Sequence, residues 1–68
     1  MKKVERLRLL IGKRGVTLCT LRPAGFVNIN GEVFDCQGVR PFLIQKGTNV
    51  IVTGVLMNHF LLVREIDV

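Results

Sequence analysis

From residue 14 onward, hydrophobic and polar positions alternate in short runs, and this pattern predicts β-strands. Glycines punctuate the same stretch and β-branched residues fill the segments between them, as is typical of strands joined by tight turns. The alternation predicts strands at residues 15–21, 25–30, 32–37, 48–56 and 60–66.

Two turn signals connect the first three strands. Pro23 restricts the backbone at the first turn, and Gly25 supplies conformational freedom just after it. Asn30 and Gly31 form a two-residue hairpin signal, because both central residues of that turn need a positive φ. The sequence therefore predicts a three-stranded antiparallel meander.

The one long connection without a strand pattern follows the third strand, at residues 37–41. We expect Phe42 or Ile44, just beyond it, to fill the bottom of a barrel. Five short strands with a plug between the third and the fourth are typical of an OB-like barrel. An SH3-like barrel has the same number of strands, but the place of the irregular connection favours the OB order. The predicted fold is all-β, a small five-stranded OB-fold-like barrel.

Alternation with a period of two also predicts which side chains lie inside the barrel. The predicted buried residues are Val16, Leu18, Val27, Ile29, Phe34, Cys36, Val50 and Val52. In this register Cys19 points outward and Cys36 inward, and opposite faces disfavour a disulfide. Two free thiols fit a reducing compartment better than an oxidising one.

The chain has 68 residues and a net charge of +5, and its basic excess lies near the N-terminus. We therefore divide it into a basic leader or linker at residues 1–13 and a barrel domain at 14–68. The leader has three readings: a solvated linker, a contact with a membrane surface, or a contact with nucleic acid.

Residue types argue against catalysis. The chain has no Ser and no Tyr, and its one histidine, His59, falls at a predicted hairpin tip far in sequence from either cysteine. A nucleophile needs a base within hydrogen-bond reach, and a structural zinc site needs about four ligands. We expect no enzymatic activity, no metal and no cofactor.

Three features are candidates for binding a partner. Phe26 is the one candidate for an exposed aromatic, and Arg22 either binds a partner or pairs with Asp35 or loop carbonyls. The last hairpin is apolar on both faces, which predicts an exposed patch and weak self-association. That patch consists of Ile51, Leu56 and either Leu61 or Val63.

Several short motifs together resemble the C-terminal soluble domain of the NfeD family. The resemblance covers nearly all of residues 10–62, although Phe26 stands where the family often has a polar residue. The motifs are Leu10-Ile11-Gly12, Gly15, Leu21-Arg22-Pro23-Ala24-Gly25, Ile29-Asn30-Gly31, Phe34-Asp35, Phe42-Leu43-Ile44, Gly47-Thr48 and Val50-Ile51-Val52.

The resemblance implies a non-catalytic protein-interaction module that scaffolds or regulates a stomatin-like partner. It also implies an OB-fold domain attached to a transmembrane segment outside this fragment, at a membrane and on its cytoplasmic side. Long members of the family carry a ClpP-like serine protease domain at their other end, and nothing of it matches here. The alternative function is a single-stranded nucleic-acid-binding OB domain, which the neutral charge of residues 15–68 disfavours.

Overall fold

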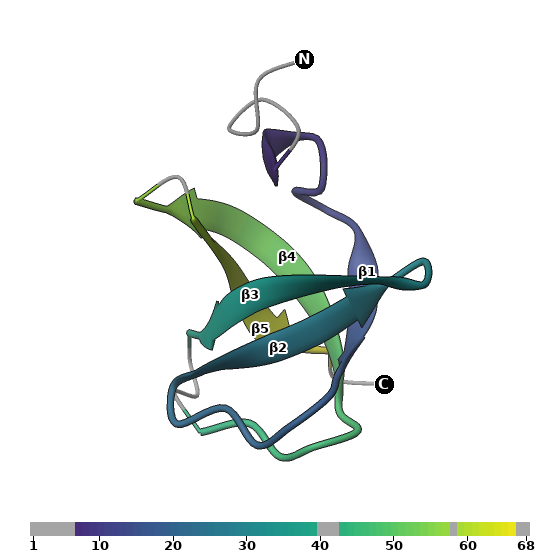
Figure 1. Ribbon diagram of the computed structural model, residues 1–68, viewed down its shortest axis with the longest axis vertical. Helices are drawn as coiled ribbons and strands as arrows, with labels where there is room; N and C mark the ends of the chain where they lie inside the picture. Colours follow the sequence, from purple (N-terminus) through teal and green to yellow (C-terminus); the bar gives the residue numbers. More distant parts are fainter. Residues whose placement is uncertain (1–6, 40–42, 58, 67–68) are drawn as a thin grey trace.

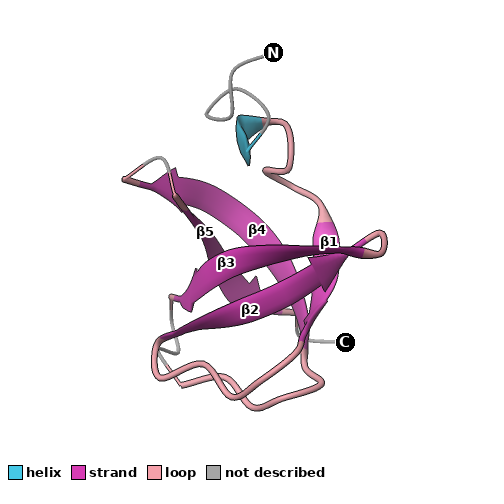
Figure 2. Ribbon diagram, viewed as in Figure 1, coloured by secondary structure: helices cyan, strands magenta, loops and turns pink. Residues whose placement is uncertain are grey.

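A computed structural model describes residues 7–39, 43–57 and 59–66 of the chain. Its strands, shown in Figure 1, are β1 (Arg14–Thr17), β2 (Ala24–Ile29), β3 (Glu32–Gly38), β4 (Asn49–Leu56) and β5 (Phe60–Glu65). They close into a barrel in the order β1-β2-β3-β5-β4. Figure 2 shows the strands wrapped around a common interior. Neighbouring strands are antiparallel except β3 and β5, which are parallel. This is the predicted OB-like barrel.

The floor of the barrel is made by two loops rather than by strands. Leu21, in the loop after β1, pairs with Ile44 through two backbone hydrogen bonds. The N–H of Leu21 donates to the carbonyl of Ile44 over 2.7 Å, and the N–H of Ile44 donates to the carbonyl of Leu21 over 3.2 Å. Both side chains are fully buried, which confirms Ile44 as a plug. Phe42, the other predicted plug, lies outside the described residues. The pairing also explains why β1 ends at Thr17 and not at residue 21, because the chain turns away from β2 to reach the floor.

Most of the predicted core is confirmed. The correctly predicted buried side chains are Val27, Ile29, Cys36, Val50 and Val52. Phe34 is half-buried and packs against them. Val16 and Leu18, however, are exposed, so the predicted register of the first strand is wrong. Thr17, which lies between them, points inward instead.

Thr17 can be buried in the core because its hydroxyl, its backbone N–H and its carbonyl all form hydrogen bonds. Its hydroxyl donates to the carbonyl of Gln45 over 2.8 Å and accepts from the backbone N–H of Thr48 over 3.0 Å. Its backbone N–H donates to the Thr48 carbonyl, and its carbonyl accepts from the N–H of Gly47. A buried hydroxyl with both capacities satisfied avoids the desolvation penalty of about 1–3 kcal/mol. The loop before β4 is therefore fastened to β1.

The part of the predicted leader that the structure describes lies against the barrel. Leu7 and Arg8 are helical, and the Leu7 side chain belongs to the core. The backbone N–H of Gly12 donates a hydrogen bond to the carbonyl of Val52, and the N–H of Val52 donates one to the carbonyl of Lys13. The division of the chain at residue 13 stays a prediction. Within the described residues, no helix is long and apolar enough to cross a membrane.

Candidate partner-binding surface

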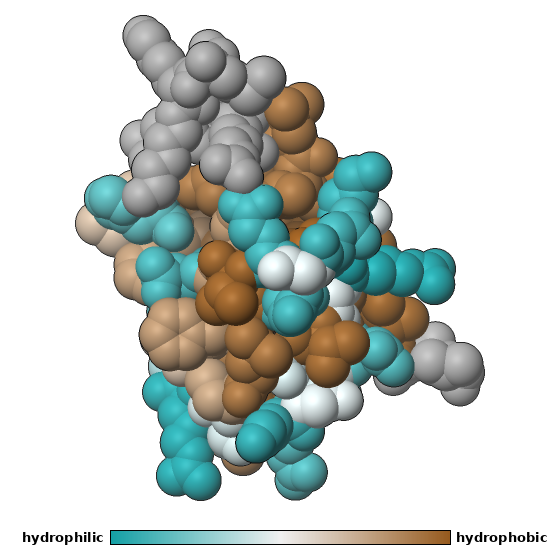
Figure 3. Space-filling view, turned by 45° about the vertical axis from the view of Figure 1, so that its right-hand side comes forward, coloured by the Kyte–Doolittle hydropathy of each residue, from teal (hydrophilic) through white to brown (hydrophobic). Residues whose placement is uncertain are grey.

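The outer side of β1, β2 and β3 carries a group of exposed apolar side chains, which we call the apolar face. Its members and their exposed fractions are Val16 (41%), Leu18 (39%), Phe26 (48%) and Val33 (55%). The strand register places them in two adjacent rows, each of which also contains a polar residue. Asn28 lies between Val16 and Val33, and the N–H of Leu18 donates to the carbonyl of Phe26. Figure 3 shows hydrophobic side chains gathered at the middle of the barrel surface.

Strand parity forces these side chains outward. Thr17, Val27 and Phe34 occupy the inner side of their strands, so their neighbours in sequence point to solvent. Gly25 lets β2 approach the loop after β1, because a Cβ there would lie 2.5 Å from Leu21 Cδ2. The face is thus held by the buried residues behind it and does not need a ligand to form.

Polar groups border the apolar face. Asp35 is exposed and stands directly across from Phe26 on β3. The side-chain oxygen of Asn28 accepts the N–H of Gly31 over 2.9 Å, which fixes the β2–β3 turn. Arg22 is exposed two residues before β2, next to the cis bond to Pro23.

The hypothesis that Arg22 has a structural role predicted a contact between its side chain and Asp35 or loop carbonyls. Among the described residues, its side chain forms no hydrogen bond or salt bridge, either to Asp35 or to a loop carbonyl. Asp35 is therefore not its partner, and a contact with loop carbonyls outside the described residues stays a prediction. Arg22 is exposed, and an exposed guanidinium can donate hydrogen bonds to a partner.

The predicted patch on the last hairpin is not formed as expected. Leu61 and Val63 are both fully buried, so the placement of Leu61 on the outer surface is wrong. Phe60 and Leu62 point outward instead, opposite Leu56 and Gly54 of β4. Ile51 is half-buried and Leu56 is 36% exposed, so the predicted contiguous patch is absent from the described hairpin. Weak self-association stays a prediction.

The two cysteines lie on the same side of the sheet, so their predicted placement on opposite faces is wrong. A Cβ at Gly25 would lie 2.6 Å from the Sγ atom of Cys19, and Gly25 is the β2 partner of Cys36. Cys19 and Cys36 therefore both lie close to Gly25, and Cys19 packs against the core to which Cys36 belongs. Both thiols are free.

Because Cys36 is buried, ionisation of its thiol should make the free energy of unfolding depend on pH in the alkaline range. Desolvation, and then the charges of Cys19 and Asp35, raise the pKa of the Cys36 thiol from 9.0 to about 12. The unfolded chain therefore loses this proton at a lower pH than the folded one. We expect the free energy of unfolding to fall between about pH 9 and pH 12, and to fall less steeply in a Cys36→Ala variant. Urea titrations across that range test this, and equal slopes would contradict it.

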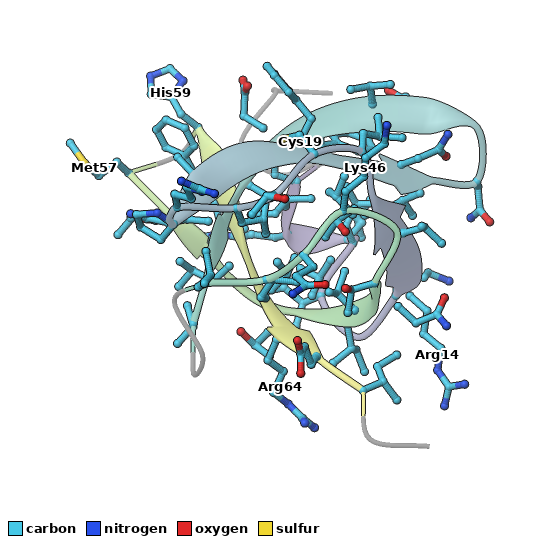
Figure 4. The ribbon with its side chains drawn as sticks, turned by 90° about the horizontal axis from the view of Figure 1, so that it is seen from below. Arg14, Cys19, Lys46, Met57, His59 and Arg64 are labelled. Atoms are coloured by element: carbon cyan, nitrogen blue, oxygen red, sulfur yellow. The ribbon has the colours of Figure 1, made fainter. Side chains whose placement is uncertain are left out.

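Little in the described residues resembles a catalytic or metal centre. No group of three or more His, Cys, Asp and Glu side chains in that part of the chain could hold a metal ion. Figure 4 shows His59 and Met57 at the β4–β5 turn, where His59 is exposed.

A closed barrel in this strand order defines a small OB-fold-like domain. Residues 7–56 match the model of the NfeD-like C-terminal, partner-binding domain, and the chain belongs to this family. The resemblance inferred from the sequence motifs is confirmed.

One solved structure that resembles the chain is the C-terminal domain of stomatin operon partner protein 1510-C from Pyrococcus horikoshii. The two share 25% sequence identity with a TM-score of 0.81, over 88% of this chain and 92% of that one. No curated protein matches the chain.

Three members of the apolar face were missed by the sequence reasoning, and only Phe26 was predicted. Val16 and Leu18 were placed inside because the parity of the first strand was taken from its apolar residues. Val33 follows the Asn30-Gly31 turn, so its outward position could have been read from the inward position of Phe34.

Proposed function

We propose that the domain is a non-catalytic interaction module whose apolar face binds a stomatin-like protein. In the full-length protein it would hold or regulate that partner at a membrane, on the cytoplasmic side. The observation that carries the proposal is the solvent-exposed apolar face in a domain of a partner-binding family. The stomatin-like partner is suggested by the name of the Pyrococcus relative.

The composition of the face supports a protein partner. Protein interfaces typically have an apolar centre with an aromatic anchor and a polar rim. Phe26 supplies the anchor, Leu18 and Val33 flank it, and Asp35 stands at the border, while Arg22 is exposed in the loop before β2. Burial of such an anchor commonly accounts for 2 kcal/mol or more of binding, roughly a thirtyfold change in affinity.

The nucleic-acid alternative receives less support. Single-strand binding by OB domains uses several stacking aromatics along a basic groove. On the described part of the face Phe26 is the only aromatic, and its neighbour across the strand is the acidic Asp35. A carboxylate beside the stacking position would repel the phosphate backbone.

The test is binding of a purified stomatin-like protein from the same organism to the chain and to two matched variants. Phe26→Glu places a charge on the apolar face and should weaken binding by roughly thirtyfold or more. Leu43→Glu makes the same kind of change at a residue of similar exposure, 55% against 48%, in the loop before β4. It should leave affinity within about twofold.

Isothermal titration calorimetry gives the affinities, and thermal melting shows that the variants remain folded. Equal binding by the parent and Phe26→Glu, with both folded, would remove the apolar face from the proposal. Arg22→Ala should also weaken binding while leaving the melting temperature unchanged, because the described structure gives its side chain no internal partner. Binding of single-stranded DNA that is lost in Phe26→Glu would favour the nucleic-acid alternative instead.

A further inference from the structure

The segment that leads into β1, and includes its first residue, combines exposed cations with exposed apolar side chains. Arg8, Lys13 and Arg14 are exposed, and between them Leu9 and Ile11 are 63% and 48% exposed. We call these five residues the amphipathic segment. They lie outside the apolar face, and the proposed protein contact makes no use of them.

The barrel holds this segment in place, so its apolar side chains cannot fold inward. Leu7 occupies the core and Leu10 packs against it. The backbone N–H of Leu10 donates a hydrogen bond to the carbonyl of Leu7 over 3.0 Å, and the N–H of Lys13 donates one to the carbonyl of Leu10 over 2.9 Å. Gly12 is also bonded to β4, over 2.8 Å to the carbonyl of Val52. With Leu7 and Leu10 committed to the barrel, Leu9 and Ile11 remain in solvent.

The electrostatic surroundings of the segment are one-sided. The sequence contains no acidic residue between residues 6 and 31. None of the three cations of the segment forms a salt bridge with another described residue. Arg14 of β1 pairs with Ile51 of β4, and Ile51 pairs in turn with Arg64 of β5. A fourth exposed cation therefore lies two strands away from Arg14, at the same level of the sheet. Figure 4 shows Arg14 and Arg64 extending outward from the same side of the barrel.

We propose that the amphipathic segment binds directly to the surface of a membrane that contains anionic phospholipids. Interfacial membrane contacts need apolar groups that enter the headgroup boundary and cations that meet the lipid phosphates, and the segment presents both within seven residues. A second copy would bring like charges together, and a single nucleic-acid strand would find no aromatic among these residues.

The test is co-sedimentation of the 68-residue chain with vesicles of phosphatidylcholine, with and without phosphatidylserine. We expect binding to the anionic vesicles only, and weaker binding as salt is raised. Lys13→Glu should reduce binding about tenfold, whereas Lys46→Glu, the same change in the loop before β4, should change it by less than about threefold. Leu9→Ser should reduce it about fivefold, and Leu43→Ser, at a similarly exposed leucine, should have almost no effect.

Each arm can overturn the proposal. Equal losses in Lys13→Glu and Lys46→Glu would show that net charge alone attracts the protein to vesicles. An unchanged Leu9→Ser variant would show that no apolar group enters the lipid. Vesicle-independent self-association that is abolished by Leu9→Ser would replace the lipid with a second copy. None of these readouts uses the stomatin-like partner, so the lipid contact can fail without affecting the proposed protein contact.

Discussion

Replacing Val50 with aspartate should unfold the domain. Val50 is fully buried on β4, between Gly15 of β1 and Glu65 of β5. A carboxylate at this position loses its water and gains no cation, and burying such a group costs several kcal/mol. A domain of this size buries only about 60% of its unfolded surface and is correspondingly marginal, so the loss should exceed its stability.

Circular dichroism during heating measures the outcome, with Asn49→Asp as the control. Asn49 is the preceding residue of β4 and is exposed, so the same new charge there stays in water. The control should melt cooperatively within a few degrees of the parent, since surface changes are usually within about 0.5 kcal/mol. A soluble Val50→Asp variant with a cooperative transition would mean that the register of β4 is different from the one described here.

The sequence predicted the barrel well where alternation and turn chemistry agree. The Asn30-Gly31 turn adopts the positive φ values that its residues favour, and β2 and β3 on either side keep the predicted inward residues. In β4 the pair Val50 and Val52 leaves only one sensible register. These segments could be predicted because each has one face that is clearly more apolar than the other.

The first strand could not be read in this way, because both of its faces contain plausible core residues. Val16 and Leu18 are the more hydrophobic pair, yet Thr17 is the buried residue. The deciding contacts come from Gln45 and Thr48, which lie 28 and 31 residues further along the chain. Local alternation carries no information about such a long-range hydrogen-bonded network. The same error hid half of the apolar face from the sequence.

The last strand was ambiguous for a different reason. Residues 60–63 are four consecutive apolar residues, so they carry no alternation at all. Their orientation is set by pairing with β3 on one side and β4 on the other, and by an irregularity in β4 between Val52 and Gly54. A bulge shifts the parity of a strand by one position, which sequence patterns alone do not locate.

A methyl group at Gly15 should destabilise the domain strongly. A Cβ built at this position would lie 2.6 Å from the backbone oxygen of Asn28 and 2.8 Å from the Cγ1 atom of Ile29. The first of these atoms belongs to the backbone of β2 and cannot rotate away, so β1 and β2 must separate. Overpacking of this kind costs about 3 kcal/mol, which lowers the melting temperature of so small a domain by roughly 10–20 °C.

Gly54→Ala is the matched control, because it makes the same substitution in another strand of the same barrel. Its nearest neighbour would be Leu62 Cδ1 at 3.5 Å, an ordinary van der Waals contact at the end of a side chain. Replacing a glycine with alanine also lowers the conformational entropy of the unfolded chain, which favours the folded state. This variant should therefore melt within a few degrees of the parent. Equal melting of Gly15→Ala and Gly54→Ala would show that β1 is not held against β2 as closely as described. Since Val16 lies on β1, Leu18 directly after it and Phe26 on β2, a separation of the two strands should also disrupt the apolar face and weaken partner binding.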